Sequence, residues 1–330
     1  MSNDVIVEKE SLGTVARNYW SKVKSGDIGS LPAVLGLVAL AGIFTTMSEF
    51  FFTNRNFANL LTQAAPVIVI AMGLVFVLLL GEIDLSAGYA SGVAGAVLVL
   101  LITNHDFPWY AALAISIGVG AVLGLLMGTL VSRIGIPSFV VTLSAFLAFQ
   151  GILLLLAGEG GTIRIEDKTI LAVENSNLSP LLSWVFFIVV AVAYVGTGLN
   201  RLNTRRRAGL KTELVKLWVI KTASLLLITG GAVFALTVER SNNPDLVSLK
   251  GIPYVVPLIL FLLAVGTFVL GRTAFGRHIY AVGGNAEAAR RAGINVKRVR
   301  ISAFVICSSL AAVAGMIFAS RQNSISPTTG

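Results

Sequence analysis

The sequence predicts an all-α fold, a polytopic transmembrane helix bundle, and three observations lead to this fold class. Of the 330 residues, 55% are hydrophobic and only 12% are charged, whereas soluble domains carry roughly 25% charged residues. Nine apolar segments approach the roughly 20 residues that a helix needs to cross a bilayer. Lysine and arginine also gather in alternate connecting segments, which is typical of a membrane protein with a fixed orientation.

The nine apolar segments set the predicted domain organisation. They lie at about 31–52, 60–80, 87–103, 110–131, 138–157, 180–199, 217–237, 253–271 and 301–320. We therefore expect a polar N-terminal tail over 1–30 and a transmembrane domain over 31–330. The tail is too long and too polar before its first apolar run to be a cleavable signal peptide, and an interfacial helix around 15–23 is expected within it.

The basic residues predict the orientation. With the N-terminus in the cytosol, 19 of the 25 Lys and Arg residues fall on the cytosolic side, as the positive-inside rule requires. The largest cytosolic groups lie in 200–216 and 272–300, and the acidic loop 158–179 lies outside. We thus expect a multi-pass protein of the plasma (cytoplasmic) membrane with a cytosolic N-terminus.

Composition and motifs argue against other classes of function. The net charge is +9, but the densest basic run, 200–216, has no interleaved aromatic residues, so it indicates anchoring to membrane lipid and not nucleic-acid binding. His105 and His278 have no partners at metal-ligand spacing, so no metal is expected. There is neither a Walker-type phosphate loop nor a nucleophile arrangement, so we expect a transport subunit without its own ATPase site.

The loop before the last apolar run contains the signals of a short helix. Asn285 suits the N-cap, Glu287 lies in the first turn and Arg290 and Arg291 in the last, as the helix dipole favours. Gly293 then suits the C′ position. A helix of about two turns is marginal alone, so we expect it to dock on another surface. The alternative is a solvated basic loop that only fixes the topology.

Two acidic residues interrupt the apolar part of the chain. Glu82 and Asp84 are the only acids within about fifty residues, and acids at membrane depth usually mark a polar pathway. A structural role is the favoured alternative: Asp84 or Ser86 would cap the following helix while Gly81 and Gly88 let the backbone bend.

Four further polar residues in apolar segments complete the predicted translocation path of Glu82, Asp84 and Ser86; they are Gln63, Thr142, Ser144 and Gln150. Gln63 is expected to face the bundle interior, either towards substrate or as a contact between helices. Thr142 and Gln150 are eight residues apart and are expected to share a helix face.

Glycines at intervals of four predict close helix packing. Gly120, Gly124 and Gly128 share one helix face, and small residues at this spacing let two helix backbones approach. Packing within one subunit is the expected use of this face, and a contact between subunits is the alternative.

Three stretches carry a resemblance to a known family: EIDLSAG at 82–88, PSFVVTL at 137–143 and the long run 273–296. They resemble the permease subunits of monosaccharide ABC importers of the ribose, galactose and xylose type. The acidic residues of 82–84 and the extended region 200–250 look most like the xylose-type permeases. The resemblance covers the chain from about residue 30.

The resemblance implies that the 272–300 loop is a coupling loop whose short helix docks on a cytosolic ABC ATPase. The residues expected to couple are Gly276, Arg277, Gly283, Gly284, Asn285, Glu287, Ala288, Ala289 and Gly293. It further implies a second permease subunit in a homodimer, an extracytoplasmic sugar-binding protein, and ATP-Mg on the ATPase, with no cofactor on this chain. The family pattern continues beyond Gly330 with a glycine-rich segment and about two more spans, so a truncated bundle is expected.

The function expected from these features is import of a monosaccharide, a pentose such as xylose, driven by a separate ATPase. An ion-coupled secondary transporter of a small polar solute is the alternative, and it would require deeply buried charged residues. Only Glu82 and Asp84 qualify. An intramembrane enzyme is a third class, for which no catalytic cluster is present.

Overall fold

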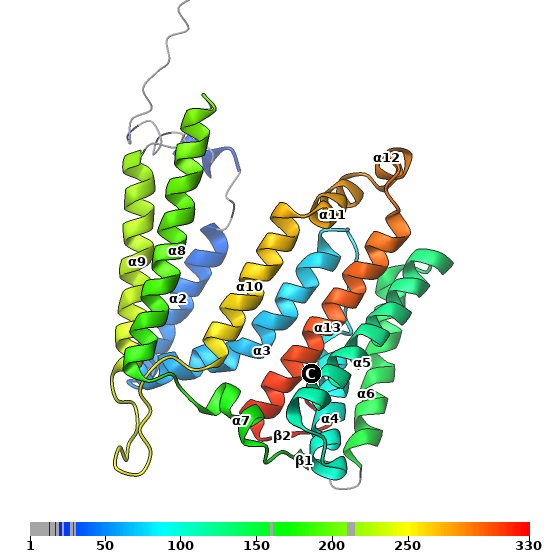
Figure 1. Ribbon diagram of the computed structural model, residues 1–330, viewed down its shortest axis with the longest axis horizontal. Coiled ribbons are helices and arrows are strands. Elements are labelled where there is room, and N and C mark those ends of the chain that lie inside the picture. Colours follow the sequence, from blue (N-terminus) through cyan, green and yellow to red (C-terminus); the bar gives the residue numbers. More distant parts are fainter. Residues whose placement is uncertain are drawn as a thin grey trace, which may run out of the picture. The chain divides into compact units, whose positions relative to one another are not determined.

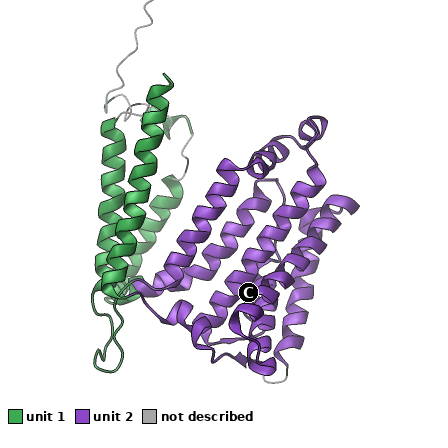
Figure 2. Ribbon diagram, viewed as in Figure 1, with its two compact units in different colours: residues 1–57, 179–251 green, residues 58–178, 252–330 purple. Residues whose placement is uncertain are grey.

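The computed structural model describes residues 31–158, 161–209 and 215–330, with isolated residues between 13 and 29. The interfacial helix expected around 15–23, like most of the tail, lies outside the described residues. Most of the described chain is helical and only two short strands are present in it, which confirms the predicted fold class. It forms two compact units, each assembled from separate stretches of sequence (Figure 2): residues 1–57 with 179–251, and residues 58–178 with 252–330. We call them unit 1 and unit 2.

Eight described helices are long and apolar enough to cross a membrane (Figure 1). They are α3 (Asn54–Leu78), α4 (Ala87–His105), α5 (Trp109–Thr129) with the π-helical turn Leu130–Ile134, α6 (Ser138–Ala157), α8 (Pro180–Arg207), α9 (Val215–Thr237), α10 (Val255–Arg272) and α13 (Val296–Gln322). They coincide with eight of the nine predicted segments. The ninth, 31–52, forms α2 (Leu31–Met47), which has only 17 residues because turns follow Met47.

Unit 1 contains α2, α8, α9 and the loop 238–251 that follows α9. Glu239 organises this loop, because its carboxylate accepts hydrogen bonds from the backbone N–H groups of Ser241 and Leu249 at 3.0 and 2.9 Å. These bonds stabilise the charged form and lower the pKa of Glu239 to about 2. The Lys250 ammonium lies 3.5 Å from the same carboxylate.

Unit 2 is built around α13, which packs against α5, α4 and the short helix α7 (Lys168–Asn175). Glycines, which have no side chain, allow the helices to approach closely. A Cβ on Gly120, Gly124 or Gly128 of α5 would meet backbone atoms of α13, at Ser308, Phe304 and Ile301 respectively. The predicted packing face is thus confirmed, and α13 of the same chain covers it.

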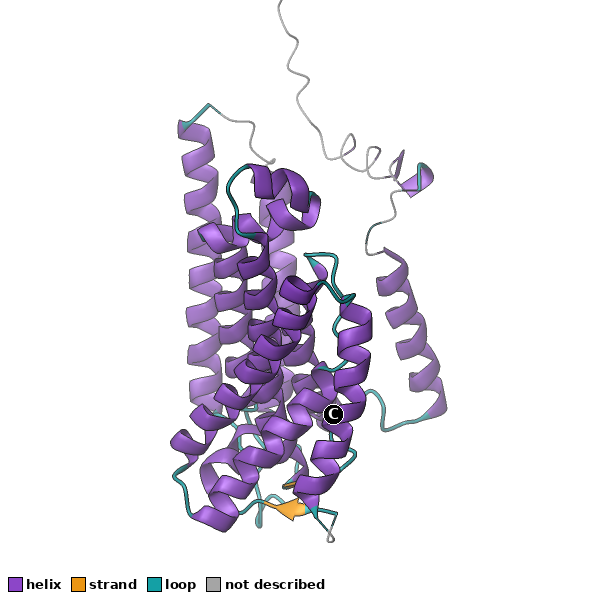
Figure 3. Cartoon of the chain, turned by 90° about the vertical axis from the view of Figure 1, so that its right-hand side faces the viewer, coloured by secondary structure: helices purple, strands orange, loops and turns teal. Residues whose placement is uncertain are grey.

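The two ends of unit 2 differ. At one end, strand β1 (Ile163–Arg164) pairs antiparallel with β2 (Ser324–Ile325), which follows α13 (Figure 3). The helices α11 (Ala274–Gly284) and α12 (Ala286–Arg291) lie at the opposite end (Figure 1). We call these the strand end and the loop end. Helix α13 runs from α12 to β2 and so connects the two ends.

A buried carboxyl group lies at the strand end. Glu174 of α7 is 8% exposed, and its backbone N–H donates to the Ser320 hydroxyl of α13 at 3.0 Å. Neither carboxylate oxygen has a hydrogen-bond partner among the described residues. Burial raises the pKa of Glu174 to about 8, and the positive charge of Arg321 offsets this only in part.

Gly124→Ala should destabilise unit 2, because the new Cβ would collide with the carbonyl oxygen of Phe304. Overpacking of this kind costs about 1–3 kcal/mol, which thermal unfolding in detergent would detect. Gly118→Ala is the matched control, since it lies on the same helix and a Cβ there meets nothing within 4 Å. Equal melting temperatures for the two variants would contradict the packing model.

The stability of unit 2 should fall as the pH rises from about 4.5 to about 8. In this window the unfolded chain loses the Glu174 proton, whereas the folded chain, with its raised pKa, keeps it. Thermal unfolding across this range should show a shallower pH dependence for Glu174→Gln than for the wild type. Identical pH dependence in both proteins would show that the carboxyl does not titrate in this way.

Candidate functional site: the loop end and the α3–α4 segment

The loop between α10 and α13 folds into two short helices. Thr273 caps α11, its hydroxyl accepting from the Gly276 N–H at 3.2 Å. Asn285 caps α12, its side-chain oxygen accepting from the Ala288 N–H at 2.9 Å. Gly293 follows α12 with φ +86°, a conformation that glycine adopts without strain. The predicted short helix and its cap are confirmed.

Helix α11 was not predicted. Its signal was available in the sequence, because Phe275, Ile279 and Val282 recur at helical spacing, and Ile279 and Val282 are buried. The preceding apolar run and the glycines at 283 and 284 obscured this pattern. The loop end therefore consists of two short helices that are each exposed on one side: α11 buries Gly276, Ile279 and Val282, and α12 buries Ala289.

The charged side chains of α12 pair with one another. The Glu287 carboxylate lies 2.8 Å from the Arg290 guanidinium and 3.3 Å from that of Arg291. The hydrogen bond from Arg290 is the main reason that the pKa of Glu287 is lowered. All three side chains are exposed, so such pairs contribute little to stability. They form an ordered, charged surface on the outside of the loop.

The predicted coupling residues separate into two groups. Gly276, Gly283 and Ala289 anchor the loop: a Cβ on Gly276 would collide with the Leu270 carbonyl, a Cβ on Gly283 would collide with the Leu79 carbonyl, and Ala289 is buried. The others are exposed; they are Arg277, Gly284, Asn285, Glu287, Ala288 and Gly293. Gly283 also reaches the surface, so the accessible surface comes from the second group together with Gly283.

Next to α11 lies the α3–α4 segment, residues 79–86, which is not helical. It turns at Gly81, where φ is +74°. The Ile83 N–H donates to the Ser138 hydroxyl of α6 at 3.2 Å, and the Thr142 hydroxyl donates to the Ile83 carbonyl at 3.1 Å. The Glu82 carboxylate lies 3.1 Å from the Arg300 guanidinium of α13.

This segment brings the start of α4 into the interior of the bundle. Gly73 of α3 approaches Cys307, since a Cβ there would lie 3.0 Å from the Cys307 carbonyl oxygen. Helix α3 continues to Leu78, about 8 Å further at ~1.5 Å per residue, and the segment then returns to Asp84, whose carboxylate lies beside the Cys307 thiol. Helix α4 therefore begins at the depth of Cys307.

Asp84, and not Ser86, supports the start of α4. The Asp84 carboxylate accepts from the Ser86 N–H at 2.9 Å and from the Ser86 hydroxyl at 2.7 Å. Ser86 occupies the N-cap position but makes no side-chain cap bond of its own. Asp84 is 6% exposed, and its second oxygen has no hydrogen-bond partner in the described part of the chain. The structural role favoured by the sequence is the one that these contacts support.

The other predicted path residues do not converge. Gln63, Ser144 and Gln150 are exposed, so the expectation that Gln63 faces the interior of this chain is wrong. Thr142 is fully buried, so it does not share a face with Gln150. The physical reason is that eight helical residues turn through about 800°, which leaves the two side chains about 80° apart.

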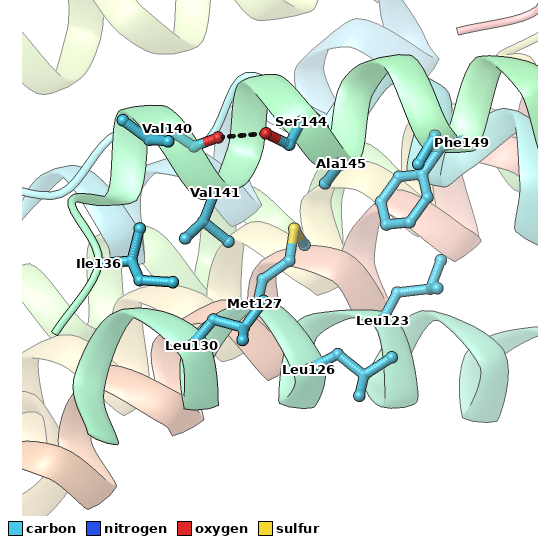
Figure 4. A pocket seen from close by; sticks show the side chains of 11 residues that line it. Leu123, Leu126, Met127, Leu130, Ile136, Val140, Val141, Ser144, Ala145 and Phe149 are labelled. Atoms are coloured by element: carbon cyan, nitrogen blue, oxygen red, sulfur yellow. Dashed lines mark hydrogen bonds between the residues drawn. The ribbon is translucent and has the colours of Figure 1, made fainter. Parts of the chain in front are cut away.

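The pocket between α5 and α6 is apolar (Figure 4). It has a volume of about 340 Å³, and its lining includes Met127, Val141 and Phe149. Ser144 is its one polar lining side chain, and the Ser144 hydroxyl donates to the Val140 carbonyl of its own helix at 2.9 Å. This hydroxyl is therefore already satisfied, and the pocket lacks the several hydrogen-bonding groups that a sugar requires. Within the described residues, no three His, Cys, Asp or Glu side chains lie close enough to hold a metal ion.

The sequence matches a known family of transport proteins. Residues 56–330 match the model described as the branched-chain amino acid transport system / permease component. The chain belongs to this family of transport permeases. Its α11–α12 loop and α3–α4 segment both lie within the matched region. The candidate site is therefore part of a permease, and the protein is a transport subunit with several membrane spans.

Individual relatives are similar over most of the chain. The xylose transport system permease protein XylH of Escherichia coli (strain K12) is 33% identical over 94% of this chain and 77% of its own length. The protein of that name from Haemophilus influenzae is 30% identical over 94% of this chain and 80% of its own. The ribose import permease protein RbsC of E. coli is 27% identical over 95% of this chain and 75% of its own. No solved structure matches the chain.

Gly283→Ala should detach α11 from the end of α3, since the added Cβ would collide with the Leu79 carbonyl oxygen. We expect faster amide hydrogen exchange across α11, because its buried side chains lose their support. Gly284→Ala is the matched control: it is the next residue, and a Cβ there meets nothing within 4 Å. Unchanged exchange in Gly283→Ala would show that the contact does not hold the helix.

Proposed function

We propose that the chain is the membrane-spanning subunit of an ABC importer that moves a monosaccharide, with a pentose such as xylose as the substrate. The α11–α12 loop is the observation that carries the proposal. It contains a capped, charged helix, α12, and close backbone contacts at Gly276 and Gly283 fix the loop to the apolar bundle. The relatives named for xylose transport, at 33 and 30% identity, support the choice of sugar.

The partner of the loop end is a cytosolic ABC ATPase. The exposed group of coupling residues would seat in a cleft of that subunit, while Gly276, Gly283 and Ala289 hold the loop to the bundle. ATP-Mg would be bound by the ATPase, and this chain would supply no ligand to the nucleotide. ATP-driven closure of two such subunits would then push on the loop and rock the bundle between outward and inward openings.

The orientation follows from charge. The distribution of lysine and arginine supports a plasma-membrane protein with its N-terminus and loop end in the cytosol. The strand end, with α7, would then face outward, towards an extracytoplasmic sugar-binding protein. Lipid covers the remaining apolar surface.

A second copy of the chain completes the path for the sugar. Gln63, Ser144 and Gln150 are exposed, so they could contact a substrate only where another subunit faces them. Glu82, Asp84, Ser86 and Thr142 instead hold the α3–α4 segment. We therefore propose a homodimer whose path lies between the two permeases.

Ala288→Arg tests the coupling surface. Ala288 is exposed on α12, so arginine there should obstruct docking while leaving the helix intact. We expect co-purification of the ATPase and uptake of labelled xylose to fall at least about tenfold, equivalent to about 1.4 kcal/mol of binding free energy.

Ala208→Arg is the matched control, because it makes the same change at an exposed residue outside the loop. Uptake of xylose that persists without the ATPase, or an Ala288→Arg variant that transports normally, would contradict the proposed function.

A further inference from the structure

The loop end makes two contacts with the α3–α4 segment, and they come from different elements. Gly283 of α11 packs on the Leu79 carbonyl at the beginning of the segment. Arg300 of α13 pairs with Glu82 three residues later, at 3.1 Å. Arg300 is only four residues from the start of α13, so it is joined directly to the loop. A movement of the loop would therefore act on the α3–α4 segment at two points.

The far end of the segment is joined to the middle of the bundle. Asp84 lies beside Cys307, seven residues beyond Arg300 on α13, which is about 10 Å along a helix. Helix α4 begins at Ala87, three residues after Asp84. The segment therefore runs along α13 from the charged loop end to the depth at which α4 starts. It is a physical connection between the ATPase-facing surface and the interior.

The segment differs from the helices around it in its backbone bonding. Its Ile83 amide and carbonyl are held by the side chains of Ser138 and Thr142, not by a helical ladder. Side-chain bonds of this kind can be exchanged singly, whereas a packed helix moves as a unit. The segment can therefore shift relative to its neighbours without movement of a whole helix.

The Glu82–Arg300 pair is also partly withdrawn from water. The two side chains are 13 and 30% exposed, in contrast to 52, 71 and 81% for Glu287, Arg290 and Arg291 of α12. Withdrawal reduces solvent screening of the pair, and loss of one partner leaves the other charge uncompensated. The pair can therefore hold the segment to α13 more firmly than a surface ion pair could.

From these contacts we infer that the Glu82–Arg300 ion pair is a transmission link. It transfers movement of the coupling loop, through the α3–α4 segment, to the start of α4. Glu82 and Arg300 are positioning residues, which contact neither the ATPase nor the sugar. This inference rests on the proposed function, because it requires a loop that an ATPase moves.

The test uses the complete complex of permease, ATPase and sugar-binding protein in proteoliposomes, with labelled xylose as the probe. Glu82→Gln and Arg300→Gln should still bind the ATPase and hydrolyse ATP. The amount of xylose moved per ATP should fall about fivefold or more, the lower end of typical coupling free energies. The exchanged pair, Glu82→Arg with Arg300→Glu, should recover most of that ratio, and Arg300→Lys should retain most of it.

Lys250→Gln is the control, because it breaks a partly exposed ion pair with Glu239 in unit 1, and it should leave the ratio unchanged. The inference is overturned if either single variant keeps the wild-type ratio, or if the exchanged pair and Arg300→Lys are no better than the Gln variants. Wild-type protein that moves xylose without ATP would instead contradict the proposed function, and therefore also the transmission link that rests on it.

Discussion

The structure depends on close contact between helix backbones around α13. Glycines of α5 and α4 bring those helices within reach of α13, and a Cβ at Gly124 or Gly95 would meet its backbone. In lipid, apolar side chains gain little by leaving one apolar surface for another, so packing and hydrogen bonds hold such helices together. With the helices fixed in this way, the rest of unit 2 can include a stretch of non-helical backbone.

That stretch, the α3–α4 segment, explains the polar residues that the sequence places in apolar surroundings. Backbone amides and carbonyls inside a membrane protein need partners. Ser138 and Thr142 supply them for Ile83, and Asp84 supplies one for Ser86. Glu82 and Asp84 therefore mark the turn between α3 and α4, where non-helical backbone lies inside the bundle. The primary role of the polar residues in this segment is therefore to maintain the fold.

Features encoded locally could be predicted from the sequence, and features that depend on contacts between distant residues could not. The cap at Asn285 and the turn at Gly293 each involve residues within one turn of helix. The residue types at these positions are therefore sufficient to identify α12. The pairing of Glu82 with Arg300 joins residues more than two hundred positions apart. Nor does the sequence show that Gln63 is exposed, because exposure depends on which helix lies beside it.

The positions of the candidate polar side chains also bear on how a neutral sugar could cross this protein. Within a single chain, the interior polar side chains that we assigned to a path are occupied by backbone groups or by each other. A sugar needs several free hydrogen-bonding groups. In this set of candidates, the buried interior offers one oxygen of Asp84, and the amides of Gln63 and Gln150 lie on exposed helix surfaces. Those surfaces must be covered in the working transporter, because an amide facing lipid is costly. The sugar-binding surface and the surface between subunits are therefore expected to be the same.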